Sequence, residues 1–225
     1  MVKSRIQMKN KPTYLFVFLM LFSLTGFAQS RTKIKAEELD KITQFLSLAT
    51  QDIASIQADF VQEKAISFME DILKAEGKFW FSSPDKIRWE YLKPYPYLVI
   101  MNNGKMSVTD ESDSYSMDMR SNQIFQQMNA LITASIQGQL LTNKLDYRKE
   151  FFIEKEFYVV CFYPNNQQMK DYLSAIELYF SKENGKVNAL KMLEAAGDYT
   201  LIRFFNRIEN RKLDASLFSA AKNMN

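Results

Sequence analysis

The chain has 225 residues, no histidine, one cysteine and a formal charge of +3 at pH 7. Without histidine it can form neither a Ser-His-Asp or Cys-His nucleophile system nor a histidine-ligated zinc site. The single Cys161 cannot form an internal disulfide or a Cys₄ metal site, and it lies in an apolar segment that predicts a small buried core residue. Walker and Gly-x-Gly-x-x-Gly phosphate-binding motifs are absent, and no cofactor is expected.

The first 28 residues predict a cleaved signal peptide. A basic segment with four Lys or Arg residues precedes an apolar run over residues 14–24 and the small-residue site Gly26-Phe27-Ala28. The apolar run is shorter than the roughly 20 residues that span a membrane, although a retained N-terminal anchor is the alternative. Gln29 rather than cysteine follows the site, so we expect no lipid there. Loss of residues 1–28 would lower the formal charge from +3 to −1, which leaves no electrostatic basis for nucleic-acid binding.

The chain after residue 28 begins with one helix and continues as strands. Apolar residues recur at helical spacing over 36–50, with acidic and basic residues on the other face. From Ser55 the period changes to two, which predicts a strand. A further strand begins near Asp71 and continues through Gly77.

The stretch from Gly77 to Ile100 is the most aromatic part of the chain and predicts three strands joined at two proline corners. Alternation places Phe79 and Phe81 on one face of their strand. It likewise groups three residues of the next strand, with Arg88 and Glu90 pointing the other way: Ile87, Trp89 and Tyr91. The aromatic face either fills a solid core or lines a cavity for an apolar guest.

The remaining elements are predicted to be mostly hairpins. Asn103-Gly104 is a strong two-residue turn signal, and residues 110–118 predict an edge strand. Residues 121–141 show helical periodicity and predict one or two inserted helices, which either plug the sheet or have a separate role. Strands follow over 146–154, 156–163, 172–181, 187–194 and 200–208, with turns at Asn184-Gly185 and Gly197-Asp198.

Many short strands at regular spacing predict a mainly β fold: an unclosed antiparallel β-barrel of about 11 strands capped by a helical lid. No repeat or low-complexity linker divides residues 29–225, which are expected to form one domain. Catalysis would have to rest on carboxylates, and we expect none, because nearly all candidates lie opposite apolar strand residues or in turns. These candidates are Asp59, Glu63, Glu70, Asp71, Asp85 and Glu90.

Together these motifs resemble the LolA family, periplasmic carriers of outer-membrane lipoproteins. The resemblance begins at residues 55–62 (SIQADFVQ) and continues through Gly77-Lys78-Phe79-Trp80-Phe81. Its most characteristic part is the run from Pro84 to Tyr91 (PDKIRWEY). Asn103-Gly104-Lys105 and the segment 213–218 (LDASLF) keep the family's order, so the match spans nearly all of the chain after residue 28.

The resemblance implies a hydrophobic cavity for lipoprotein acyl chains or another lipid. Its walls would include Phe60, Phe79, Phe81, Ile87, Trp89, Tyr91 and Ile100. The lid would lie over 121–141 and include Phe125, Met128, Leu131, Ile132 and Ile136. It also implies a monomer in the periplasm that receives cargo from an inner-membrane lipoprotein-releasing transporter and delivers it to an outer-membrane receptor.

Ser83 is a departure from the family pattern. Well-studied members have an arginine directly before this proline, which hydrogen-bonds to the lid, and a serine cannot supply the donors of a guanidinium. The hydrogen bonds that hold the lid in those members are therefore made by another residue or missing here, and the cargo can differ. The alternative function is an interaction or sensor module of the cell envelope that has the same fold and binds a membrane protein.

Overall fold

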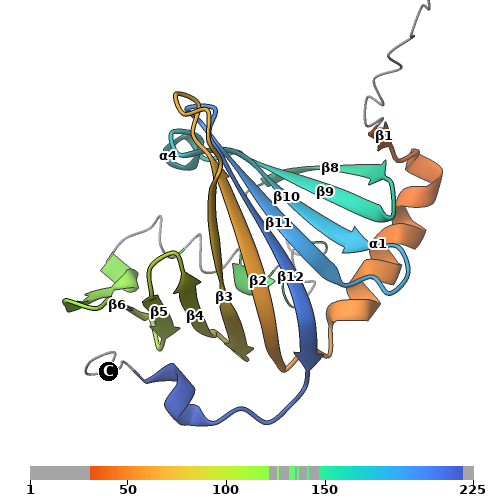
Figure 1. The fold of residues 1–225 in the computed structure, drawn as a ribbon. Coiled ribbons are helices and arrows are strands. Elements are labelled where there is room, and N and C mark those ends of the chain that lie inside the picture. The colour runs from red at the N-terminus through yellow and green to blue at the C-terminus, as the bar shows by residue number, and fades with distance from the viewer. Residues whose placement is uncertain are drawn as a thin grey trace, which may run out of the picture. The chain divides into compact units, whose positions relative to one another are not determined.

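The computed structural model describes residues 31–121 and 147–219, together with residues 126, 132–134, 136 and 141 (Figure 1). The described residues group as one compact unit. The predicted signal peptide lies outside the described residues. Among the described residues, no helix combines the length and the apolar character needed to cross a membrane.

The described chain is one antiparallel sheet with few helices. Its helical elements are α1 (Ala36–Thr50), α4 (Gln167–Lys170) and the 3₁₀ turns η1 (Met119–Ser121) and η2 (Ala215–Phe218), and the isolated described residues 126, 132–134, 136 and 141 are also helical. Its strands are β1 (Thr32–Lys33), β2 (Ser55–Ala65), β3 (Leu73–Ser82), β4 (Lys86–Lys93), β5 (Tyr97–Asn102), β6 (Lys105–Thr109), β7 (Ser114–Asp118), β8 (Tyr147–Glu154), β9 (Phe157–Pro164), β10 (Leu173–Ser181), β11 (Val187–Glu194) and β12 (Tyr199–Glu209).

The sheet is not closed, as the sequence predicts. Its 12 strands follow the order β1-β8-β9-β10-β11-β12-β2-β3-β4-β5-β6-β7, so β1 and β7 are its two edges. The expected number of about 11 strands omits β1, which has only two residues and is too short to produce an alternating pattern. The predicted edge strand over 110–118 corresponds to β7, at the opposite edge.

Local sequence signals account for several boundaries. The predicted helix over 36–50 has the bounds of α1. Asn103 and Gly104 have φ angles of 52° and 71°, and Asn102 pairs directly with Lys105. This is the two-residue turn that the Asn-Gly signal predicts, because both central positions require positive φ.

Two buried clusters occupy the face of the sheet that carries α1, which we call the inner face. In the first cluster, Ile42 and Leu46 of α1 pack against β9 and β10, including Phe162 and Ile176. The second lies on β2, β3 and β4 and is rich in aromatic residues. Leu190 of β11 packs against both clusters, so it marks the boundary between them.

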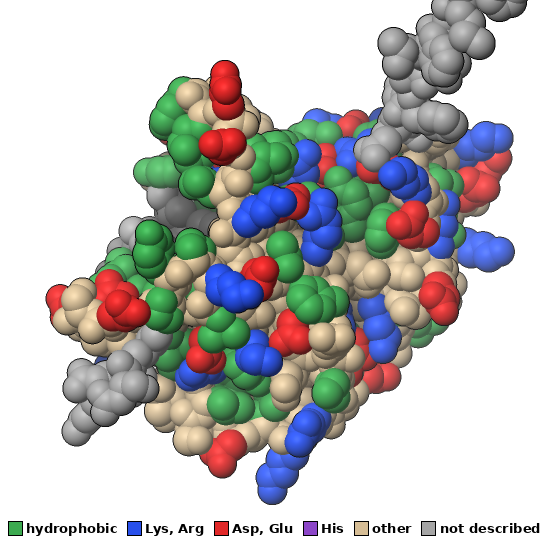
Figure 2. All heavy atoms as spheres, in the orientation of Figure 1, with side chains coloured by type: hydrophobic (Ala, Val, Ile, Leu, Met, Phe, Trp, Pro, Cys, Tyr) green, Lys and Arg blue, Asp and Glu red, His purple; other side chains and the backbone are tan. Residues whose placement is uncertain are grey.

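The opposite, outer face of the sheet is polar around its central strands. Lys78 pairs with Asp59 at 3.1 Å, and Arg203 pairs with Glu63 at 2.9 Å. Figure 2 shows basic and acidic side chains interspersed over the strands that face the viewer in Figure 1. The alternation of polar and apolar residues along these strands therefore separates a wet outer face from an apolar inner face.

Candidate functional site

A cavity of about 240 Å³ lies on the inner face of the sheet. It is larger than the engineered apolar cavity of about 150 Å³ that binds benzene. Most of its lining side chains are aliphatic or aromatic and come from β2–β5 and β10–β12. The lining residues are Ile56, Ala58, Gln62, Phe79, Ile87, Trp89, Tyr91, Tyr97, Val99, Met101, Ile132, Ile136, Ile176, Leu178, Val187, Leu190, Met192, Ile202, Phe204 and Arg207.

The pairing of β3 with β4 places the aromatic residues of both strands on the inner face. Phe79 pairs with Trp89 and Phe81 pairs with Ile87, and directly paired residues point to the same side of a sheet. The rings of Phe79 and Trp89 meet edge to face at 4.9 Å, and Phe204 of β12 lies 5.5 Å from Phe79. The proline-cornered stretch thus builds one wall of the cavity from two strands.

The seven predicted wall residues do not all line the cavity. Four of them do: Phe79, Ile87, Trp89 and Tyr91. Phe60 and Phe81 belong to the same buried cluster but are fully buried among its other side chains. The Phe60 ring meets the rings of both Trp89 and Tyr91 at about 5 Å, so it supports the wall from behind.

Ile100 is not among the lining residues, and its predicted place in the wall is wrong. It pairs with Arg88, whose side chain points to the outer face, where η2 contacts β4 and β5. The neighbouring Val99 and Met101 pair with Trp89 and Ile87 and line the cavity in its place. A one-residue shift along a strand moves a side chain to the other face, and the sequence pattern did not fix this register.

The predicted lid is described only in part. Ile132 and Ile136 are helical, half-buried and line the cavity. Phe125, Met128 and Leu131 lie outside the described residues. Ser83 follows β3 directly, and its backbone N–H donates to the carbonyl oxygen of Ala54 at 2.8 Å.

A small polar group borders the cavity on β2, β4 and β5. The Tyr91 hydroxyl donates to Gln62 Oε1 at 2.8 Å, and the ring of Tyr97 stacks on that of Tyr91 at 4.1 Å. Burial raises the pKa of Tyr91, so its hydroxyl stays protonated at neutral pH and the pair is uncharged.

Arg207 is a lining residue that sequence reasoning missed. Simple alternation from Ile202 and Phe204 would place Asn206 and Ile208 on the inner face. A bulge between Phe205 and Ile208 reverses this, so Arg207 lines the cavity and Ile208 is 45% exposed. The sequence offers one signal for this bulge, an asparagine in the middle of a strand. Asparagine tolerates a positive φ better than most residues, and Asn206 has a φ of 51°.

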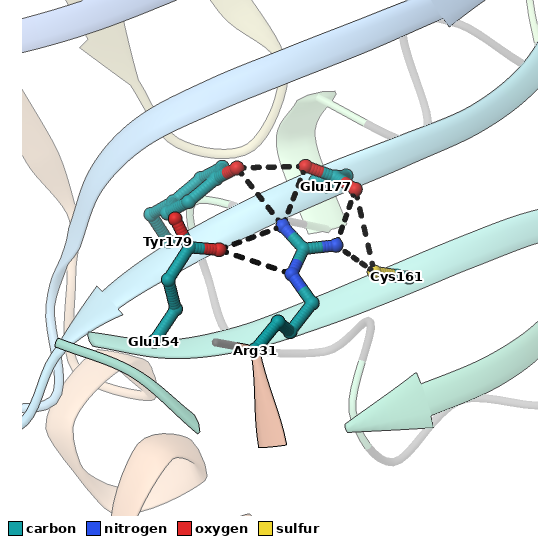
Figure 3. Close-up of polar contacts among 5 residues, drawn as sticks. All are labelled: Arg31, Glu154, Cys161, Glu177 and Tyr179. Carbon is teal, nitrogen blue, oxygen red and sulfur yellow. Dashed lines mark hydrogen bonds and ion pairs between the residues drawn. The ribbon is translucent and has the colours of Figure 1, made fainter. Parts of the chain in front are cut away.

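A second polar cluster lies away from the cavity and holds strands together (Figure 3). The guanidinium of Arg31 contacts Glu177 at 2.7 Å and Glu154 at 3.0 Å, and the Tyr179 hydroxyl donates to Glu177 at 2.7 Å. The thiol of Cys161 is buried in the same cluster, and burial raises its pKa to about 12. The cluster attaches the chain just before β1 to β8 and β10, and the protonated thiol has little nucleophilic character.

Within the described residues, no group of three or more His, Cys, Asp or Glu side chains could hold a metal ion. The apolar cavity on the inner face is the candidate ligand site.

Comparison with known proteins gives consistent matches. The family model described as "Outer membrane lipoprotein carrier protein LolA" matches residues 51–221. The outer-membrane lipoprotein carrier protein of Methylococcus capsulatus is 23% identical over 212 residues, which cover 92% of this chain and 93% of the relative. That of Chromohalobacter salexigens is 25% identical over 175 residues, covering 77% of this chain and 80% of the relative.

Among solved structures, a LolA superfamily protein from Nitrosomonas europaea aligns with a TM-score of 0.43 and 10% identity, over 81% of this chain and 97% of that chain. The family model spans most of the sequence, from the residue that follows α1 to just past the 3₁₀ turn η2. The chain therefore belongs to the family of the outer membrane lipoprotein carrier protein LolA.

Proposed function

We propose that this protein is a periplasmic carrier that binds the acyl chains of lipoproteins, or of a related lipid, and moves them from the inner to the outer membrane. The observation that carries the proposal is the apolar cavity of about 240 Å³ on the inner face of a LolA-family sheet. An inner-membrane transporter would load the carrier, an outer-membrane receptor would unload it, and the carrier would act as a monomer after loss of residues 1–28.

The energetics of acyl-chain burial are consistent with an open sheet. Each buried methylene contributes about 0.8 kcal/mol, so one chain of about 16 carbons contributes about 12 kcal/mol when fully buried. Two or three fully enclosed chains would exceed the practical limit of non-covalent affinity, roughly 18–21 kcal/mol. A carrier that must release its cargo therefore benefits from partial burial, which a sheet that is not closed favours.

Side chains that adapt their shape favour varied lipid cargo. Met101 and Met192 line the cavity beside the aliphatic residues. Methionine is unbranched and polarisable, which suits it to irregular apolar surfaces. The segment that carries Ile132 and Ile136 would cover the bound chain, and Ser83 in place of the family's arginine would alter how that cover is held.

A transfer assay tests the proposal. The protein is mixed with donor vesicles that carry a fluorescent triacylated lipopeptide, and transfer to acceptor vesicles is followed. Ile87→Glu places a charge in the cavity wall, and transfer should fall at least tenfold. Ile208→Glu makes the same chemical change on the outer face, where Ile208 is 45% exposed, and should leave transfer unchanged.

Equal transfer by wild type and Ile87→Glu would contradict the placement of the lipid site. Circular dichroism and thermal unfolding of both variants separate loss of binding from loss of fold. A pulldown from envelope extracts that returns one stoichiometric protein and no lipid would favour the sensor module instead.

A further inference from the structure

Arg207 places a cation in a cavity that is otherwise apolar or uncharged. Among the described lining residues it is the one with a formal charge, and the amide oxygen of Gln62 is already engaged by Tyr91. The Arg207 side chain is 16% exposed. A buried charge is destabilising unless it is paired and hydrogen-bonded. The presence of the Arg207 guanidinium in this wall therefore needs a physical explanation.

The described residues accept hydrogen bonds from only some of the N–H groups of the Arg207 guanidinium. Nη1 donates to the carbonyl oxygen of Val187 at 2.9 Å. Nε lies 2.7 Å from Glu209 Oε1, but neither atom forms a well-aligned hydrogen bond, and Nη2 has no acceptor within the described ranges. Burial lowers the pKa of the guanidinium, and Glu209 acts in the opposite direction. Two buried donor atoms of a residue that lines the cavity thus lack a hydrogen-bond acceptor among the described residues.

The charges around Arg207 do not cancel. Glu209 is the carboxylate partner of Arg207, but its other oxygen accepts from Lys186, which extends from the β10–β11 turn. Two cations share one carboxylate, which leaves one positive charge uncompensated within this group. An added anion would therefore find a favourable field here rather than a neutral pair.

A second lining residue, Trp89, also has a buried donor without a described acceptor. The indole Nε1 of Trp89 is buried and has no acceptor in the part of the chain that the structure describes. Arg207 lies on β12, next to β2, and Trp89 lies on β4, beyond the Phe79 residue that pairs with Ala58, and both line the cavity. A buried donor without an acceptor is destabilising, and a ligand oxygen within hydrogen-bond distance would remove that cost.

From these observations we propose that the cavity binds an amphiphile, an acyl chain that bears a terminal carboxylate or phosphate, with the oxyanion accepting hydrogen bonds from Arg207. The apolar walls hold the chain and the guanidinium holds its charged end. A planar guanidinium can donate to two oxygens of one carboxylate or phosphate. This inference rests on the proposed lipid-binding function, and it specifies the polar end of the ligand.

Four probes test the charge requirement on the intact chain by calorimetry or by displacement of a fluorescent acyl probe. Palmitate and hexadecyl phosphate carry both a chain and an oxyanion, hexadecanol carries the chain alone, and inorganic phosphate carries the anion alone. Wild type should bind palmitate or hexadecyl phosphate at least tenfold more tightly than hexadecanol. Inorganic phosphate should displace neither.

Variants assign the preference to Arg207. Arg207→Gln should weaken binding of the anionic probes at least tenfold and change hexadecanol binding less than twofold. Arg207→Lys keeps the charge and should retain part of the preference. Arg203→Gln is the control, because Arg203 lies on the same strand, is 52% exposed and pairs with Glu63 on the outer face.

The outcomes separate the two proposals. Equal binding of palmitate and hexadecanol by wild type would overturn the oxyanion site while leaving the lipid cavity intact, and this comparison needs no variant. Binding of inorganic phosphate alone with similar affinity would also overturn it, because the site would then serve a free anion. If no chain-bearing probe binds, the lipid-carrier function itself fails.

Discussion

Gly77 of β3 lies directly opposite Phe60 of β2, and the Phe60 ring occupies the space that a side chain at residue 77 would need. A Cβ at this position would lie 2.7 Å from the Phe60 ring and 2.0 Å from the carbonyl oxygen of Glu90. The absent side chain lets Phe60 pack beneath Trp89 and Tyr91. A glycine in a strand interior is thus explained by close packing behind the cavity wall.

Gly77→Ala should therefore destabilise the protein by about 3 kcal/mol, because the clash involves both a packed ring and the backbone of β4. Denaturant unfolding measures the change. Lys78→Ala on the outer face is the matched control and should cost about 1 kcal/mol or less. A Gly77→Ala variant as stable as wild type would show that β3 and β4 can separate at little cost.

Filling the cavity should reduce binding without loss of stability. Ala58 is 2% exposed and lines the cavity, so Ala58→Leu adds three carbons to the space for an acyl chain. Exclusion of two to three methylenes costs about 2 kcal/mol of binding, or roughly 30-fold in Kd. A fluorescent fatty acid titration measures this, with Val61→Leu on the outer face of β2 as the control. Unchanged affinity would place the bound chain elsewhere.

The bulge in β12 should depend on Asn206. Its backbone has a positive φ, and its side chain donates to Asp59 Oδ2 at 2.8 Å. Asn206→Val should lose about 2–3 kcal/mol of stability, because a β-branched residue is strained at this φ and the hydrogen bond is removed. Asn206→Gly keeps the backbone freedom and should lose less. Equal losses in denaturant unfolding would mean that the positive φ is not the main constraint.

The sequence predicts features that depend on neighbouring residues in the chain better than features that depend on pairing between strands. Local patterns predicted α1, the Asn103-Gly104 turn and the shared face of Ile87, Trp89 and Tyr91. They failed where one residue changes the face. Ile100 points outward because of the register of β4 against β5, and Arg207 points inward because of a bulge set by pairing with β2. Such register depends on contacts between strands, which alternation within one strand does not report.

The cluster around Arg31 should make the free energy of unfolding depend on pH in the acidic range. Burial raises the pKa of Glu177, but hydrogen bonds from Arg31 and Tyr179 outweigh it, and the net pKa is lowered. A lowered carboxyl pKa gives stability that is complete above the unfolded value of about 4.3 and is lost as pH falls through the folded value. The stability advantage of wild type over Glu177→Gln should therefore be constant near neutrality and shrink below about pH 4.3.

Chemical denaturation at several pH values measures this advantage. Glu156→Gln, an exposed carboxylate between β8 and β9, is the control and should show no such trend. If the difference between wild type and Glu177→Gln stayed constant down to pH 2, the Arg31–Glu177 pair would not contribute through its charge.

The lipid content of the natively purified protein tests the central claim most directly. The protein is purified without detergent, extracted with organic solvent and analysed by mass spectrometry, with Ile87→Glu prepared in parallel. A carrier of this kind should yield acyl lipid at close to one molecule per protein, and Ile87→Glu should yield at least tenfold less. An extract of wild type without lipid, together with no uptake of a fluorescent fatty acid by the same sample, would contradict the lipid-carrier function.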